Sequence, residues 1–252
     1  MKVYKSIAFA SLIIGIVLCV VGFFMNGLGE LPDETQKLSK YVTIRSYGKA
    51  RNVSTELSVD NDCNLSLELS AVNGTIKYYD GEVIKVEADN VDRDYEFKYD
   101  GVKANISFDG VNNKKQAGNV ELYLPKNIRF NEVGLDFDAT NITMEALQCT
   151  QLDLESDASK VTIKRLQVDG KTSIANDTGD LRLNYLKTNS FDIENDMGNV
   201  EVTMAEARNQ YHVDKDGNLS SINVSKTDKV IGNKNITIDT DLGNVTIHFE
   251  GE

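Results

Sequence analysis

Apolar and polar residues alternate in short runs along most of the chain, and the runs come in pairs. In the C-terminal half, for example, Phe191-x-Ile193 is followed by Val200-x-Val202. The interval from the end of the first run to the start of the second is seven residues in four of five such pairs. Alternation with a period of two is typical of half-buried β-strands. The pattern therefore predicts pairs of short strands joined by a corner.

The paired runs recur at intervals of about 19 or 20 residues, which indicates a repeat architecture. One such turn cannot bury its apolar face alone, but turns stacked about 4.8 Å apart can. We therefore expect an all-β fold, a β-solenoid, and the same pattern at Leu67-x-Leu69 and Gly74-x-Ile76 extends it toward the N-terminus. The first runs of the six C-terminal turns are Leu135-x-Phe137, Leu152-x-Leu154, Thr172-x-Ile174, Phe191-x-Ile193, Tyr211-x-Val213 and Ile236-x-Ile238.

Stacked turns predict three columns of buried side chains. The turn at Leu135 should be distorted, because its gap is only five residues and lacks Gly, and so should the turn at Tyr211, which carries an insert over 214–235. The same alternation also fits a twisted two-sheet sandwich of hairpins, and contact between Ile174 and Ile193 distinguishes the two. The columns are Phe137, Leu154, Ile174, Ile193 and Ile238; Ile142, Val161, Leu181, Val200 and Val245; and Leu147, Leu166 and Leu186.

An Asp-x-Gly-Asp/Asn motif fills the interval three times, beginning at Asp177, Asp196 and Asp241. Gly tolerates a positive φ, and Asp or Asn bonds to the following amides, so the motif predicts a corner. The alternative is that these three carboxylates bind calcium, which would relieve the repulsion between stacked charges. Because the copies are imperfect and the corners at 139–141 and 156–160 lack Gly, we favour the corner over the metal site.

The first 40 residues differ from the rest. Residues 7–25 form a run of 19 residues without charge, which as a helix reaches about 28 Å, close to the thickness of a bilayer core. Lys2 and Lys5 precede the run and acidic residues follow it, so we expect a cytoplasmic N-terminus. The predicted order is a cytoplasmic segment over 1–6, a transmembrane anchor over 7–25, a tether over 26–40 and an exported domain over 41–252. A cleaved signal peptide is the alternative, although the exit lacks an A-x-A-like site.

The composition restricts the partners. The chain has 27 Lys and Arg against 39 Asp and Glu, and its net charge is -12. This charge would repel a nucleic-acid backbone and favours a cationic partner. The expected partners are the membrane, through the N-terminal helix, and an envelope protein, peptide or glycan.

Residues suited to zinc or acyl chemistry do not form known motifs. His212 and His248 have no zinc-ligand spacing, so we expect surface positions for them. Ser46-x-x-Lys49 lacks the companion motifs of penicillin-binding enzymes. No cofactor is expected, and we do not expect an enzyme.

Two further observations leave alternatives open. Asp153 and Asp192 are candidate carboxylates for a glycan-cleaving enzyme, because β-helices often carry such activity on one face. Cys63 and Cys149 lie on the exported side, and the sequence does not show whether they pair.

The segment GNVELYLP at Gly118–Pro125, continuing into Asn127–Leu135 and the repeated Asp-x-Gly-Asp/Asn corners, resembles the putative adhesin family of bacterial β-strand-repeat domains, domain-of-unknown-function family 4097. The resemblance covers residues 41–249. It implies a right-handed, single-stranded β-helix-like domain outside a bacterial membrane, with no established catalytic site. Some relatives occur in envelope-stress and signalling systems.

We therefore expect a membrane-anchored extracytoplasmic β-repeat module that acts in binding or adhesion at the cell envelope, with envelope-stress sensing as a finer role. A structural protein that assembles end to end is the alternative, since the last run, Val245–Phe249, would leave unpaired backbone unless it is capped. A glycan-cleaving enzyme is the other alternative.

Overall fold

Twenty β-strands and one short 3-10 helix, η2 (Arg208–Gln210), form the regular structure of the residues that the computed structural model describes: 50–111, 117–217 and 219–250. These residues lie in one compact unit, Tyr47–Glu252. The predicted all-β class is confirmed for them. The predicted segments 1–6, 7–25 and 26–40 lie outside the described residues. No helix within the described ranges is long and apolar enough to cross a membrane.

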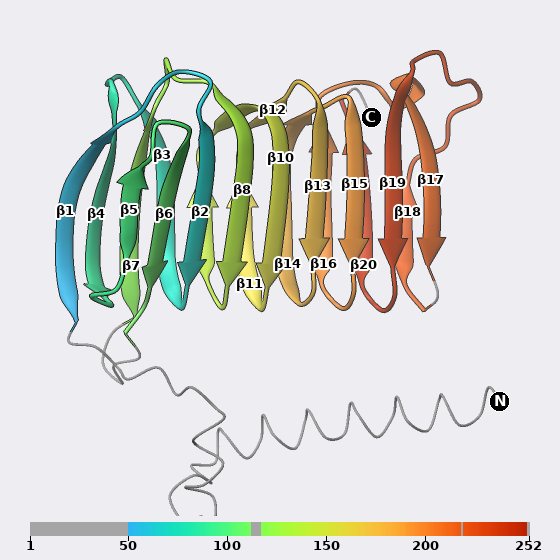
Figure 1. Ribbon diagram of the computed structural model, residues 1–252. Helices are drawn as coiled ribbons and strands as arrows, with labels where there is room; N and C mark the ends of the chain where they lie inside the picture. The colour runs from blue at the N-terminus through green and yellow to red at the C-terminus, as the bar shows by residue number, and fades with distance from the viewer. Residues whose placement is uncertain (1–49, 112–116, 218, 251–252) are drawn as a thin grey trace, which may run out of the picture. The chain divides into compact units, whose positions relative to one another are not determined.

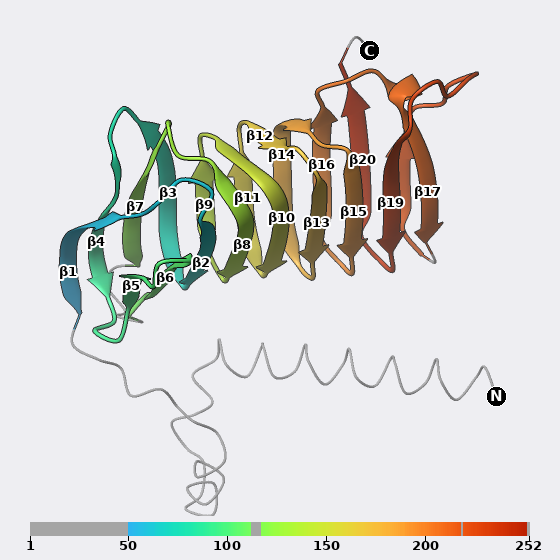
Figure 2. The same ribbon diagram turned by 45° about the horizontal axis from the view of Figure 1, so that its top comes forward.

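The strands pair in two ladders that face each other across the core, and Figures 1 and 2 show them as two layers. A short strand, β12 (Leu166–Val168), bonds to both, through β10 and β14. Ladder 1 contains, in order of hydrogen bonding, β1 (Arg51–Ser58), β4 (Val83–Val91), β7 (Gly118–Pro125), β3 (Val72–Tyr79), β9 (Asn141–Met144), β11 (Ser159–Ile163), β14 (Gly179–Lys187), β16 (Asn199–Met204), β20 (Asn244–Phe249) and β18 (Ser221–Val224). Ladder 2 contains β5 (Glu96–Tyr99), β6 (Lys103–Asp109), β2 (Asn64–Ser70), β8 (Phe130–Asp138), β10 (Leu147–Asp157), β13 (Lys171–Asn176), β15 (Ser190–Asn195), β19 (Lys234–Thr240) and β17 (Tyr211–Gly217).

Successive turns of the chain pair in parallel. Each turn places one strand in ladder 2 and the next in ladder 1, as in β13 and β14 followed by β15 and β16. Ile174 lies level with Ile193, and Leu181 lies level with Val200. The hairpin pairing of the sandwich alternative is therefore wrong for these turns. Antiparallel pairing among the named strands is confined to β1 with β4, β4 with β7 and β5 with β6, at the N-terminal end.

Two of the three predicted columns are confirmed. Ile142, Val161, Leu181, Val200 and Val245 stack in register along ladder 1, and Leu147, Leu166 and Leu186 stack where β12 joins the ladders. All of these side chains are buried. The core thus consists of stacked aliphatic side chains on neighbouring strands, which is the arrangement that the period of 19 or 20 residues predicts.

The first predicted column is wrong at one position. Leu135, not Phe137, lies level with Leu154, and Phe137 lies level with Ser156. Counted from Leu135, the interval to Ile142 is seven residues, as in the other turns. The strands of the turn at Leu135 are therefore in regular register, because the interval had been counted from Phe137 instead of Leu135.

The turns do not follow one another in space in the order of the sequence. β19 bonds to β15 on one side and to β17 on the other, although β17 precedes it in the chain. β20 likewise lies between β16 and β18. At the other end β2 lies between β6 and β8, and Figures 1 and 2 show both exchanges. The predicted open edge at Val245–Phe249 is therefore wrong, because β20 has a partner strand on each side.

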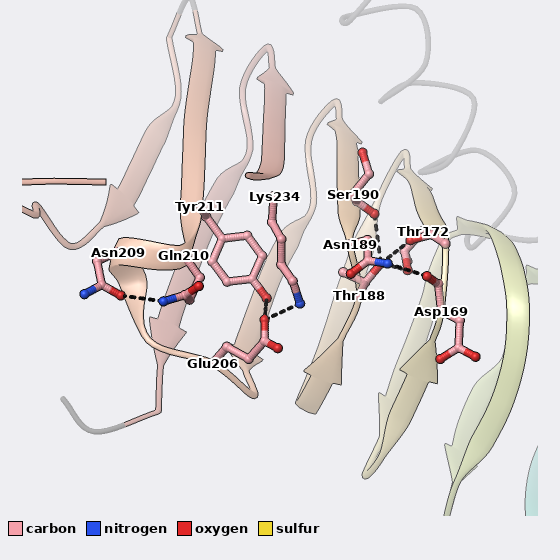
Figure 3. Close-up of polar contacts among 11 residues, drawn as sticks. Asp169, Thr172, Thr188, Asn189, Ser190, Glu206, Asn209, Gln210, Tyr211 and Lys234 are labelled. Atoms are coloured by element: carbon pink, nitrogen blue, oxygen red, sulfur yellow. Dashed lines mark hydrogen bonds and ion pairs between the residues drawn. The ribbon is translucent and has the colours of Figure 1, made fainter. Parts of the chain in front are cut away.

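A partly buried polar cluster joins the segment before β17 to β19, where this exchange occurs. Glu206 accepts hydrogen bonds from Lys234 Nζ and from the Tyr211 hydroxyl, the latter at 3.0 Å (Figure 3). The side chains of Lys234 and Glu206 are only 17% and 28% exposed. Burial by itself raises the pKa of Glu206, but the hydrogen bonds from Lys234 and Tyr211, with the lysine charge, lower it on balance below its ordinary value. The ionised carboxylate therefore stabilises the folded state.

The terminal turn, formed by β17 and β18, carries polar residues at core positions. Lys215 lies level with Ile238, at the end of the column that contains Ile174 and Ile193, and its side chain is exposed. Val213 and Ile222 are only partly buried. A lysine at the edge of a sheet is a common means of preventing edge-to-edge association.

We expect Lys215→Ile to promote end-to-end association of the full chain in detergent, because it completes an aliphatic column at an unpaired edge. Sedimentation velocity over a range of concentrations measures this. Lys229→Ile, in an exposed loop, should stay as monomeric as the parent. Identical sedimentation of the two variants would contradict a capping role for Lys215.

We expect Glu206→Gln to lower stability at neutral pH by about 1–3 kcal/mol, because Lys234 then keeps a poorly compensated charge. Since the pKa of Glu206 is lowered by folding, its contribution is present above the ordinary carboxyl pKa of 4.5 and is lost as the pH falls through the folded value. Urea unfolding of variant and parent at neutral and acidic pH tests this. A difference that stays constant down to the lowest pH would contradict it, and Glu250→Gln serves as an exposed control.

Candidate binding face

Four carboxylates surround two small residues on the outer face of ladder 2. Ser173 and Ala175 on β13 lie level with Asp153 and Glu155 on β10, and with Asp192 and Glu194 on β15. Alternation places all six side chains outward, since Leu154, Ile174 and Ile193 between them are buried. Because the residues on β13 are small, the two acidic rows flank a shallow groove of about 210 Å³.

Lys171 is the one cation that lines this groove. Its Nζ lies 2.7 Å from Asp192 Oδ2. The hydrogen bond to Asp192, followed by the charges of Asp192, Asp153 and Glu194, raises the pKa of Lys171. The shift reports a negative local field, which a bound cationic group would also experience.

The acidic character extends beyond the groove. Asp153 and Asp192, which the sequence singled out, share one column, with Ser173 on the strand between them. Two strand spacings separate their backbones by about 9–10 Å. At the outward positions of β8, β10, β13, β15, β19 and β17, Lys171 is the only Lys or Arg. We call this surface the acidic face; its carboxylates are Glu132, Asp136, Asp138, Asp153, Glu155, Asp157, Asp192, Glu194, Asp214, Asp216 and Asp239.

The calcium candidates Asp177, Asp196 and Asp241 lie one per turn at an exposed corner between the ladders. Burial, then the charges of Asp157 and Asp196, raise the pKa of Asp177. Across the described ranges, no group of three or more His, Cys, Asp or Glu side chains is arranged to hold a metal ion. The charges of Asp157 and Asp196 thus act on the Asp177 carboxylate, and calcium binding by these three residues stays a prediction.

The residue before each of these Asp residues explains the motif, and sequence reasoning missed it. Asn176 and Asn195 are buried, and Asn176 Nδ2 donates to Asn195 Oδ1 at 2.7 Å. Asn195 Nδ2 in turn donates to the Gly198 carbonyl at 3.0 Å and to Thr240 Oγ1 at 3.2 Å. A row of hydrogen-bonded polar side chains therefore runs from turn to turn beneath the corners. The Asn-Asp dipeptides at 176–177 and 195–196 were the signal for it in the sequence.

The row of polar side chains requires glycine at two of the three corners. A Cβ at Gly198 would lie 1.9 Å from Asn176 Nδ2, and a Cβ at Gly243 would lie 1.9 Å from Asn195 Nδ2. Of the three motif glycines, only Gly179 has a positive φ, +127°. The prediction that the motif needs Gly for its φ is therefore right at one corner and wrong at two. At these two the Asn amide leaves no room for a side chain, and neither does the carbonyl oxygen of the preceding motif glycine, which is 2.8 Å from a Cβ at Gly198 and 2.6 Å from one at Gly243.

The corners without Gly use a different geometry. Ala139 and Ala158 adopt positive φ values of 51° and 49°. The Ser159 hydroxyl donates to the Phe137 carbonyl at 2.9 Å and accepts from the Thr140 amide at 2.9 Å. A buried hydroxyl thus takes the place of the Asn side chain, and the predicted irregularity of these turns is confined to the corner.

The other candidates do not assemble into a site. His212 and His248 are exposed and lie on β17 and β20, in different ladders. Cys63 and Cys149 are free and buried, and burial raises the pKa of Cys149 to about 12. Their thiols are therefore poorly suited to nucleophilic chemistry. Ser46 and Lys49 lie outside the described residues.

Comparisons with known proteins give a match to a family model and weak likenesses to solved structures. The family model described as Toastrack DUF4097 matches residues 33–249. No curated protein matches the chain. A putative cell adhesion protein from Clostridium sporogenes is 10% identical over 79% of this chain and 100% of that chain, with a TM-score of 0.44. A putative adhesin from Bacteroides fragilis is 13% identical over 81% and 98%, with a TM-score of 0.40.

We expect Gly198→Ala to destabilise the protein by about 1–3 kcal/mol, because the new methyl group displaces the Asn176 amide. Asn176→Ala should also destabilise it, but the double variant should be more stable than the sum of the two losses predicts, by about 1 kcal/mol or more. Urea unfolding measures the cycle. Gly134→Ala is the control, because a Cβ there meets nothing within 4 Å. Strict additivity of the two losses would contradict the proposed steric role.

Proposed function

The chain belongs to the Toastrack DUF4097 family, and from that premise we propose that it is an extracytoplasmic binding module whose acidic face holds a cationic partner at the cell envelope. The proposal includes the single-pass anchor over 7–25 with a cytoplasmic N-terminus. It also includes a right-handed β-solenoid as the form of the exported domain. Envelope-stress sensing is the finer role within it.

The arrangement of carboxylates around Ser173 and Ala175 carries the proposal. Four carboxylates from β10 and β15 surround two small side chains, and one lysine lies among them. Strand spacing fixes the backbones that carry these charges about 9–10 Å apart across the groove and about 7 Å apart along a strand. Such a rigid array loses little side-chain entropy when a partner with several cationic groups binds.

Charge supports this direction of binding. The chain carries -12 overall, so long-range attraction accelerates the approach of a cationic partner and is screened by salt. Lys171 is already bonded to Asp192 on one side of the groove. An incoming ammonium or guanidinium group would take the equivalent place on the other side, beside Asp153 and Glu155. The partner class that fits is a protein segment or peptide rich in Lys or Arg.

A self-assembling structural role is less well supported. It depended on an open edge at Val245–Phe249, and β20 has neighbours on both sides there. The edge at this end of the stack, β17 with β18, carries Lys215 at a core position.

We expect the quadruple variant Asp153→Asn, Glu155→Gln, Asp192→Asn and Glu194→Gln to bind an octalysine peptide at least tenfold more weakly than the parent, since several charge-assisted contacts are lost. Calorimetric titration of the full chain in non-ionic detergent at low salt measures the affinity. The parent affinity should also fall as salt is added.

A matched control has the same change in charge elsewhere: Glu82→Gln, Glu87→Gln, Asp94→Asn and Asp228→Asn, all at exposed positions. This control should retain most of the parent affinity. Equal weakening in both variants would show that overall charge, not the acidic face, attracts the peptide, and would overturn the proposal.

A further inference from the structure

The outer face of ladder 1 carries a second groove with a different chemistry. It has a volume of about 550 Å³ and crosses β11, β14 and β16. Pockets that hold small ligands generally have about 300–1,000 Å³. The polar side chains that line it are Lys160, Thr162, Asp180, Arg182, Asn184, Asn199 and Glu201. We propose that this polar groove binds a neutral, hydroxyl-rich glycan chain, independently of the function assigned to the acidic face.

The charges in the polar groove cancel. Arg182 Nη2 lies 2.6 Å from Glu201 Oε2, so one cation and one carboxylate neutralise each other. Lys160 lies level with Asp180 on the neighbouring strand and supplies the second cation and carboxylate. The groove therefore differs from the acidic face, where carboxylates outnumber Lys171. Asp180 and Glu201 would repel a polyanion, and Lys160 and Arg182 would repel a polycation, so a neutral ligand fits best.

Neighbouring side chains fix the orientation of both carboxylates. Asp180 Oδ1 accepts from Asn199 Nδ2 at 3.0 Å, and Asn199 Oδ1 accepts from Asn244 Nδ2 at 2.8 Å. Glu201 Oε2 accepts from Arg182. Within the described part of the chain, Asp180 Oδ2 and Glu201 Oε1 have no recorded hydrogen-bond partner. Each carboxylate thus offers one oriented oxygen, which accepts strongly from a hydroxyl group.

Donors lie beside these acceptors. Lys160 Nζ makes no ion pair or hydrogen bond within the described residues, although Asp180 is its cross-strand neighbour, and the Asn184 amide also has no recorded partner there. Thr162 adds a hydroxyl between Lys160 and Arg182. A sugar hydroxyl both donates and accepts, so adjacent hydroxyls on one ring can use this mixture of donors and acceptors.

The same chemistry continues along ladder 1 on both sides of the groove. Asn141 and Thr143 on β9 lie level with Lys160 and Thr162, and Asn244 and Thr246 on β20 lie level with Asn199 and Glu201. These side chains are uncharged and repeat at the strand spacing of about 4.8 Å. A ligand made of repeated hydroxylated units can therefore extend across several strands, which favours an oligosaccharide over a single sugar.

The test is calorimetric titration of the full chain, held in a detergent without a sugar headgroup, with cellohexaose, maltohexaose, chitohexaose and hexagalacturonate. We expect at least one neutral hexasaccharide to bind with a Kd below about 1 mM, and hexagalacturonate to bind more weakly. Asp180→Asn with Glu201→Gln, which preserves shape, should weaken the neutral ligand at least tenfold and strengthen hexagalacturonate. A merely structural role for these residues would not reverse the preference.

Asp153→Asn with Glu194→Gln makes the same change in charge on the acidic face and should leave the neutral ligand's affinity unchanged. The proposal is overturned if no neutral hexasaccharide binds below about 1 mM, if hexagalacturonate is preferred by the parent, or if both double variants weaken binding equally. The polar-groove variant should bind octalysine as the parent does. Failure of the glycan proposal can therefore be distinguished from failure of the proposed function of the acidic face.

Discussion

Parallel, in-register hydrogen bonding between successive turns is the constraint on which the other features depend. Strands about 4.8 Å apart bring equivalent side chains into contact, so one aliphatic position per turn becomes a continuous buried column. Leu181, Val200 and Val245 form one such column. A slip of one residue would expose the whole column to water, so burial fixes the register. The same register fixes the outward columns, and both candidate binding faces follow from it.

Much of this stacking could be predicted from the sequence, because alternation and period are explicit in the aliphatic residues. The error at Phe137 arose where Leu135 and Phe137 are both apolar, so hydrophobicity alone did not show which one lies level with Leu154. The spatial order of the turns could not be predicted in this way. Tyr211-x-Val213 and Ile236-x-Ile238 have the same pattern, and either would stack on Phe191-x-Ile193. The choice depends on tertiary contacts such as that of Glu206 with Lys234.

The binding faces could be predicted only in part. Asp153 and Asp192 were recognised as outward carboxylates, but their relation across Ser173 depends on register. The role of Gly at the corners was predicted from backbone conformation, whereas at Gly198 and Gly243 the cause is the Asn side chain of the preceding turn. A contact between turns is invisible when each motif is considered alone. The two ladders thus share one core but differ in their outer faces. The face of ladder 2 is acidic, whereas the charges in the polar groove of ladder 1 are balanced.

The exchange of turns at the C-terminal end affects how the chain reaches its final form. Residues Lys234–Thr240 and Asn244–Phe249 follow β17 and β18 in the chain, yet they lie between these strands and the preceding turn of the stack. Because β17 and β18 pair with β19 and β20, their native pairing cannot form before those later strands are present. Deletion of β19 and β20 would remove an interior layer and separate β17 and β18 from the strands they pair with, so the native order of the stack depends on these two strands.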